Sequence, residues 1–166
     1  MSGTAPPPFG RPWSERFPGP APQPLAASDR MELHDGLRVL GFLPAEWQEG
    51  LCHRPIGPEP EALLVLGALA PGIRALRLTF LGPADPAPLG RIRLLYEGQA
   101  LPVAPVPAAP GLVSLIPGAW ALEAPLPPPE ELPRPAWGRL TILFDRVLPD
   151  GGRWVGPFLH AIEFPG

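Results

Sequence analysis

The chain has 166 residues, enough for one domain, with 30 prolines, 19 glycines and a hydrophobic share of 45%. That hydrophobic share excludes a wholly disordered chain, and the prolines exclude long helices because each destabilises a helix interior by about 3 kcal/mol. The formal net charge is −3, from 13 basic and 16 acidic residues, and no basic run suggests nucleic-acid binding. The counts predict a turn-rich domain with a proline-rich extension.

The N-terminal segment differs in composition from the rest of the chain. Residues 1–28 hold eight prolines and no periodic apolar face, so we expect an extended or disordered arm before a folded domain of residues 29–166. Phe9, Trp13 and Phe17 recur in this arm at a four-residue spacing. Two readings stay open: a loose tail, or a docking arm for its own domain or a protein partner, since exposed aromatics are unfavourable in water.

Beyond Gly36, short apolar runs alternate with turns rich in glycine and proline. Period-two alternation is clear at 76–80, where Arg77 and Thr79 are expected to face water. No amphipathic segment long enough for a crossover helix separates the runs, so an all-β antiparallel β-sandwich is predicted. We predict about eight strands, at 37–43, 62–69, 74–81, 91–96, 112–116, 119–122, 139–147 and 158–164.

The residues that could carry chemistry are few and scattered. Cys52 is the only cysteine, so no intramolecular disulfide can form. Cys52 and His53 are neighbours whose side chains point apart in an extended chain, so we expect an inert, partly buried cysteine instead of a nucleophile with its base. Ser114 lies in an apolar run and should be buried, and His160 should be a hydrogen-bonded core residue. We therefore predict no enzyme activity, no metal site and no cofactor.

Targeting signals are also missing from the pattern. The first eight residues have neither a basic region nor an apolar stretch, which argues against a secretory signal. The longest apolar run, at 62–70, is far too short to span a membrane. We expect a cytoplasmic protein without a membrane span.

Tryptophans beside predicted turns offer the clearest sign of binding. A Trp or Tyr face can stack on a sugar ring while neighbouring polar groups bind its hydroxyls. Trp120 and Trp137 are assigned to the core, where most tryptophans of a small domain lie. The remaining aromatics and their polar neighbours form the predicted ligand site, which comprises Trp47, Glu49, Arg54, Tyr96 and Trp154.

Two parts of the chain carry a resemblance to a known kind of module. Gly41, Phe42, Glu46, Gly50 and Arg54 precede the apolar run 62–66, and a closing pattern comprises Asp150, Gly151, Arg153, Gly156 and the run 158–164. Both resemble the β-sandwich module that accompanies many bacterial glycosyltransferases and some methyltransferases of surface-polysaccharide clusters. The resemblance covers about residues 36–164, with degenerate motifs. At one position it departs from the pattern, because Pro55 stands where that module has a tryptophan.

The resemblance implies a non-catalytic, jelly-roll-like accessory module that engages a glycan or a glycan-synthesising enzyme. The departure at Pro55 implies a weaker sugar site, or one carried by Trp47, if the missing tryptophan is a stacking platform. The alternative is a structural protein that assembles with itself or with a protein partner through its proline-rich arm. Deleting residues 1–28 and measuring the molecular mass by light scattering separates these two readings.

Overall fold

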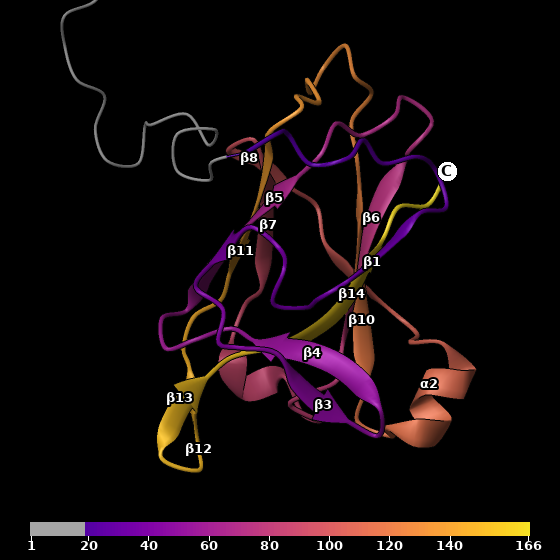
Figure 1. Ribbon diagram of the computed structural model, residues 1–166. Coiled ribbons are helices and arrows are strands. Elements are labelled where there is room, and N and C mark those ends of the chain that lie inside the picture. The colour runs from indigo at the N-terminus through magenta and orange to yellow at the C-terminus, as the bar shows by residue number, and fades with distance from the viewer. Residues whose placement is uncertain (1–18) are drawn as a thin grey trace, which may run out of the picture.

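The computed structural model describes residues 19–166. Within that range the chain is nearly all β and forms an antiparallel β-sandwich, which confirms the predicted fold class. Figure 1 shows one sheet around β5, β7 and β11 and the other around β6, β10 and β14. Among the described residues, no helix has both the length and the apolar character needed to cross a membrane.

The larger sheet has seven strands in the order β3-β4-β14-β6-β10-β9, with β1 also paired to β14. Its register is interrupted on β14 between Leu159 and Ala161, at His160. A bulge of this kind re-aims one side chain relative to its neighbours. The strands are β1 (Arg30–Glu32), β3 (Glu46–Gln48), β4 (Leu51–Pro55), β6 (Ala75–Phe80), β9 (Ala104–Val106), β10 (Trp120–Pro125) and β14 (Phe158–Glu163).

The second sheet has five strands in the order β2-β5-β11-β7-β8. They are β2 (Val39–Leu40), β5 (Glu61–Leu66), β7 (Arg93–Tyr96), β8 (Gln99–Leu101) and β11 (Gly138–Leu143). The remaining elements are the hairpin of β12 (Leu148–Asp150) and β13 (Arg153–Val155), the 3-10 turn η2 (Ala87–Leu89) and the helix α2 (Pro110–Leu115).

The core lies between the two sheets and follows the alternation of their strands. On β6, Leu76, Leu78 and Phe80 are fully buried against the other sheet. Arg77 and Thr79 lie on the outer face of the sheet, as the alternation predicted. There they line a cavity, and Thr79 is only 5% exposed. The loop before α2 and α2 itself line the same cavity, so they shield part of a face that the sequence suggested was open to water.

One predicted strand is wrong. The run 112–116 was expected to be extended, but Pro110–Leu115 forms α2, and the amide of Ile116 donates to the Leu112 oxygen. Pro110 occupies an early helical position, where its missing N–H is not needed. Ser114 is consequently exposed instead of buried, and its hydroxyl donates to the Pro110 oxygen. A five-residue apolar run fits a strand or a helix equally well by periodicity.

Several short strands were not predicted. They are β1, β3, β4, β8, β9, β12 and β13. Pro55, Pro105 and Pro149 lie inside three of them, and proline argues against a central strand in sequence reasoning. β9 lies at the end of its sheet, where one side of the strand needs no partner and proline is tolerated.

Ordered contacts begin before the boundary predicted at residue 29. The amide of Leu25 donates to the Ala68 oxygen at 2.8 Å, and Ala70 donates back to Leu25 at 2.9 Å. Ser28 donates to the Phe164 oxygen at 2.8 Å. The segment from Leu25 to Ser28 is therefore tied to the sandwich. Phe9, Trp13 and Phe17, the predicted docking residues, lie outside the described residues.

Candidate functional site

Two tryptophans stand out as exposed aromatic surface. Trp47 on β3 is 71% exposed and Trp154 on β13 is 55% exposed, whereas Phe80, Tyr96 and Phe164 are fully buried. A buried Trp removes roughly 150–250 Å² of surface from water. Two indoles left largely in solvent therefore form the most prominent apolar surface among the described residues.

Glu49 lies at the tip of the hairpin that carries Trp47. Glu49 and Gly50 connect β3 to β4 with φ angles of 51° and 77°. Two consecutive residues with positive φ form the tight turn whose twist matches a two-stranded hairpin. The turn places the exposed Glu49 carboxylate one residue beyond Gln48 and two beyond Trp47.

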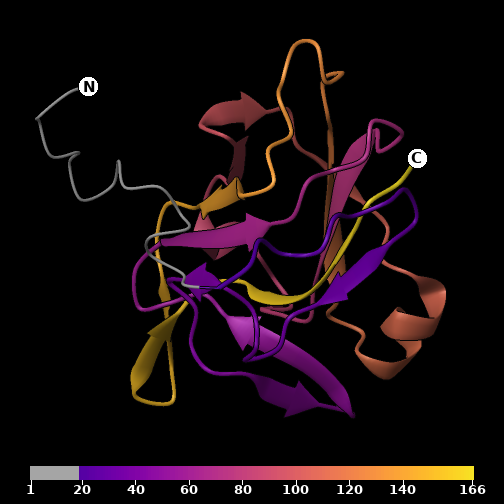
Figure 2. The same ribbon diagram turned by 45° about the horizontal axis from the view of Figure 1, so that its top comes forward.

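A partly exposed ion pair joins this hairpin to the one that carries Trp154. The guanidinium of Arg153 donates to both carboxylate oxygens of Glu46, and its Nη2 also donates to Asp150 Oδ2 at 2.9 Å. The hydrogen bond from Arg153 holds the pKa of Glu46 below its usual value. Figures 1 and 2 show the two hairpins at the same end of the molecule. Sequence reasoning placed Trp47 and Trp154 in the predicted ligand site but did not predict this ion pair, because Glu46 and Arg153 are 107 positions apart.

Trp47 and Trp154 each stand next to one residue of the ion pair. Trp47 directly follows Glu46 on β3, and Trp154 directly follows Arg153 on β13. Because successive side chains on a strand point to opposite sides, each indole lies on the side of its hairpin away from the ion pair. The structure thus brings the two hairpins together and leaves both indoles exposed.

Arg54 and Tyr96, also predicted to bind ligand, are buried. Arg54 is 8% exposed and donates from Nε to the Leu43 oxygen at 2.8 Å. Tyr96 has no exposed surface, and burial raises the pKa of its hydroxyl to about 12. Neither side chain can offer a face to a ligand, so both belong to the packing of the sandwich. Tyr96 was placed at a turn by sequence, but it ends β7 on the strand face that points into the core.

The two tryptophans assigned to the core pack as half-buried residues. The Trp120 ring stacks on Phe80 with centroids 4.2 Å apart, and its Nε1 donates to the Pro83 oxygen at 2.8 Å. Trp137 lies under the guanidinium of Arg38, 4.9 Å from the ring centroid. Both rings are covered by their own domain, unlike Trp47 and Trp154.

Cys52 and His53 occupy opposite faces of β4. The Cys52 thiol is buried and donates to the Leu33 oxygen, and burial raises its pKa. His53 is 3% exposed, stacks on Phe158 with centroids 5.1 Å apart, and has its Nε2 3.4 Å from Glu46 Oε1. Burial lowers the pKa of His53. The thiol and the imidazole thus have different surroundings and do not form a nucleophile–base pair.

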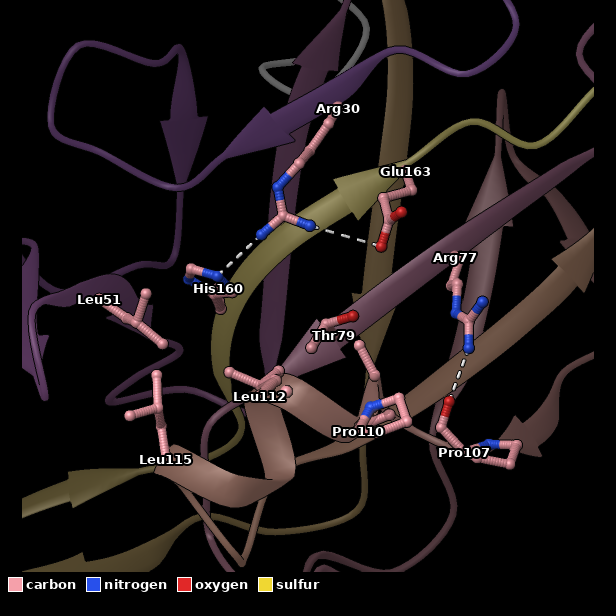
Figure 3. Close-up of a pocket in the computed structure, with 13 residues that line it drawn as sticks. Arg30, Leu51, Arg77, Thr79, Pro107, Pro110, Leu112, Leu115, His160 and Glu163 are labelled. Carbon is pink, nitrogen blue, oxygen red and sulfur yellow. Dashed lines mark hydrogen bonds and ion pairs between the residues drawn. The ribbon is translucent and has the colours of Figure 1, made fainter.

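A cavity of about 640 Å³ lies on the outer face of the larger sheet, beside α2 (Figure 3). One wall consists of polar side chains from β1, β6 and β14, and the other is apolar and comes mainly from the segment 107–115. The polar residues are Arg30, Arg77, Thr79, His160 and Glu163; the apolar wall includes Leu51, Pro107, Pro110, Leu112 and Leu115. Sequence reasoning missed this cavity because it expected 112–116 to be a strand.

His160 belongs to the polar wall of the cavity and is only 1% exposed. Its Nδ1 lies 2.6 Å from the Cys52 oxygen, and its Nε2 lies 3.0 Å from Nη2 of Arg30. A carbonyl only accepts and a guanidinium only donates, so Nδ1 carries the proton and Nε2 accepts from Arg30. His160 is thus a hydrogen-bonded buried residue, and it holds Arg30 toward the cavity.

Within residues 19–166, no group of three or more His, Cys, Asp or Glu side chains is arranged to hold a metal ion. No family model matches the chain, and no curated protein matches it. Among solved structures, the chain is similar to a family 35 carbohydrate binding module from Clostridium thermocellum. The identity is 12% and the TM-score is 0.47, over 81% of this chain and 96% of that one.

Proposed function

We propose that this chain is a glycan-binding module without catalytic activity of its own, and that Trp47 and Trp154 are its stacking platforms. The observation that carries the proposal is the 71% exposure of Trp47 beside Gln48 and Glu49. An indole face fits the C–H face of a sugar ring, and the exposed Glu49 carboxylate at the hairpin turn can bind its hydroxyls. Trp154, on the second hairpin, offers another exposed indole, while the neighbouring Arg153 is held by Glu46 and Asp150.

The geometry makes each contact shallow. Both indoles stand on hairpins and not in a cleft, so a sugar stacked on either one stays mostly in water. A site that buries little of its ligand binds weakly. A polymer with many equivalent units can contact both indoles of one molecule, which raises the overall affinity without a new contact. We therefore propose a polysaccharide, or the enzyme complex that synthesises it, as the partner.

The first test is a glycan array followed by titration calorimetry with the best-binding polysaccharide. We expect Trp47→Ala to weaken binding about tenfold, which corresponds to about 1.4 kcal/mol of lost stacking. Trp154→Ala should weaken polymer binding by a similar factor while changing the binding of a monosaccharide less. Val113→Ala, an exposed apolar residue on α2, is the matched control and should bind as the unmodified chain does.

The outcomes against the proposal are equally definite. An array without any bound glycan would contradict it, as would equal affinities for the unmodified chain and for both tryptophan variants. Both variants change exposed side chains, so a loss of binding without a loss of folding is attributable to the indoles.

A further inference from the structure

We propose that the cavity beside α2 binds a small monocarboxylic acid with an aliphatic body. This site is separate from the tryptophan surfaces, and its ligand differs from the proposed glycan. The cavity combines one polar wall and one aliphatic wall within about 640 Å³, a volume typical of small-molecule sites. Figure 3 shows Arg30, Thr79 and His160 across the cavity from Leu112 and Leu115.

The charge of the cavity favours an anion. Arg30 and Arg77 line it together with one acidic residue, Glu163. The cavity lining is therefore net positive in a chain whose formal net charge is −3. Local positive charge inside a concave surface attracts anions more strongly than the same charge on a flat surface.

Arg77 and Thr79 supply the donors for the carboxylate. The Nη2 of Arg77 donates to the Pro107 oxygen at 2.6 Å, which leaves its other N–H groups available. Thr79 is 5% exposed, and Figure 3 draws no hydrogen bond between its hydroxyl and the other lining residues. Both side chains lie on the outer face of β6, two residues apart, so they are neighbours on one strand. A guanidinium and a hydroxyl side by side can bind the two oxygens of one carboxylate.

Arg30 has a different role, because its guanidinium is already engaged. It donates to Nε2 of His160 at 3.0 Å and pairs with Glu163 at 3.5 Å and Glu32 at 3.6 Å. The buried His160, itself hydrogen-bonded to Cys52, holds the Arg30 side chain in place. Arg30 therefore offsets the charge of Glu163, which would otherwise repel an anion next to Arg77.

The aliphatic wall is the reason for proposing that the ligand has an aliphatic body. Leu115 is 55% exposed and Leu112 is half-buried on the side of α2 that lines the cavity. Covering apolar surface contributes roughly 25 cal/mol per Å². Among residues 19–166, no Trp, Tyr or Phe side chain lines the cavity, so this lining lacks the stacking face that a sugar ring prefers. An alkyl chain, in contrast, fits leucine and proline side chains directly.

The probe for the test is hexanoate, titrated into the full chain and followed by amide NMR. We expect shifts at Thr79, Leu112 and Leu115 and a Kd of about 1 mM, given the small number of ligand atoms. Three matched ligands serve as controls. Hexylamine reverses the charge of the head group, hexanol removes that charge, and acetate keeps the carboxylate but shortens the alkyl chain. All three should bind at least about tenfold more weakly than hexanoate, because each lacks one of the two contacts.

Two variants test whether hexanoate binds in this cavity. Arg77→Gln removes the positive charge and should weaken hexanoate about tenfold or more. Leu115→Glu introduces a carboxylate at an exposed position of the apolar wall and should abolish binding. Arg93→Gln, an exposed arginine on β7 of the other sheet, is the control and should leave the affinity unchanged.

The proposal is overturned if hexanol binds as tightly as hexanoate, if Arg77→Gln and Leu115→Glu bind as the unmodified chain does, or if the shifts map elsewhere. Absence of hexanoate binding up to its solubility limit overturns it as well. None of these results bears on glycan binding at Trp47 and Trp154, so the two proposals fail independently.

Discussion

Replacing Gly41 by alanine is expected to destabilise the fold by about 3 kcal/mol or more. Gly41 has a φ of 80°, and a Cβ placed on it would collide with the backbone oxygen of Glu61 at the start of β5. The Gly41 oxygen also accepts a hydrogen bond from the Gly57 amide at 3.0 Å, so the backbone cannot move away freely. Denaturant unfolding of the purified variant measures the change.

Gly50→Ala is the matched control for this prediction. Gly50 has a nearly identical φ of 77°, but a Cβ there meets nothing within 4 Å. It should lose only the left-handed strain, about 1 kcal/mol. Equal destabilisation of the two variants would show that the contact with Glu61 has no energetic weight, and the packing of this segment against β5 would need revision.

Acid should destabilise the protein through His53, and His53→Phe should remove that part of the effect. Burial holds the pKa of folded His53 below 6.5, so the unfolded chain takes up this proton first as the pH falls. The free energy of unfolding contributed by His53 is complete above pH 6.5 and is lost progressively below it. Phenylalanine keeps the stack on Phe158 and does not titrate.

The same variant tests the buried nitrogens of His53. Neither ring nitrogen makes a hydrogen bond to a described residue, and Nε2 has only its 3.4 Å contact with Glu46 Oε1. Removing such groups should raise the stability at neutral pH by about 1 kcal/mol. Equilibrium unfolding of the two proteins across the pH range measures both effects. An unchanged pH slope in His53→Phe just below pH 6.5 would contradict the assignment.

Glu46 titrates in a separate window, which keeps the two contributions apart. The hydrogen bond from Arg153 holds its pKa below 4.5, so its stabilising effect is present above pH 4.5 and is lost below it. His34→Gln, at an exposed histidine, is the control and should retain the His53 part of the slope.

The predictions that succeeded from sequence rest on local physics. Alternating residues at 76–80 place leucines and a phenylalanine on one side of a strand, and the structure buries that side. Turn residues and abundant prolines exclude long helices for steric reasons that apply in any fold. The exposure of Trp47 and Trp154 beside turns follows from the same local pattern.

The predictions that failed depended on contacts made elsewhere in the chain. Arg54 and Tyr96 have the chemistry of binding residues, but their strand faces point into packed surroundings that no local pattern reveals. The run 112–116 forms a helix, not a strand, and its periodicity is too short to distinguish the two. The short strands β1 and β9 exist because the longer strands β14 and β10 supply their hydrogen bonds.

The amino-acid sequence by itself thus determined the class of the fold, the main strands and the place of two exposed tryptophans beside turns, because these depend on steric limits and residue alternation. Only the tertiary structure decided that Glu46 meets Arg153 and that Arg30, Arg77 and Thr79 share a cavity with α2. The physical reason is sequence separation: these groups lie far apart in the chain, and the pairing and packing of the folded elements decide which side chains meet.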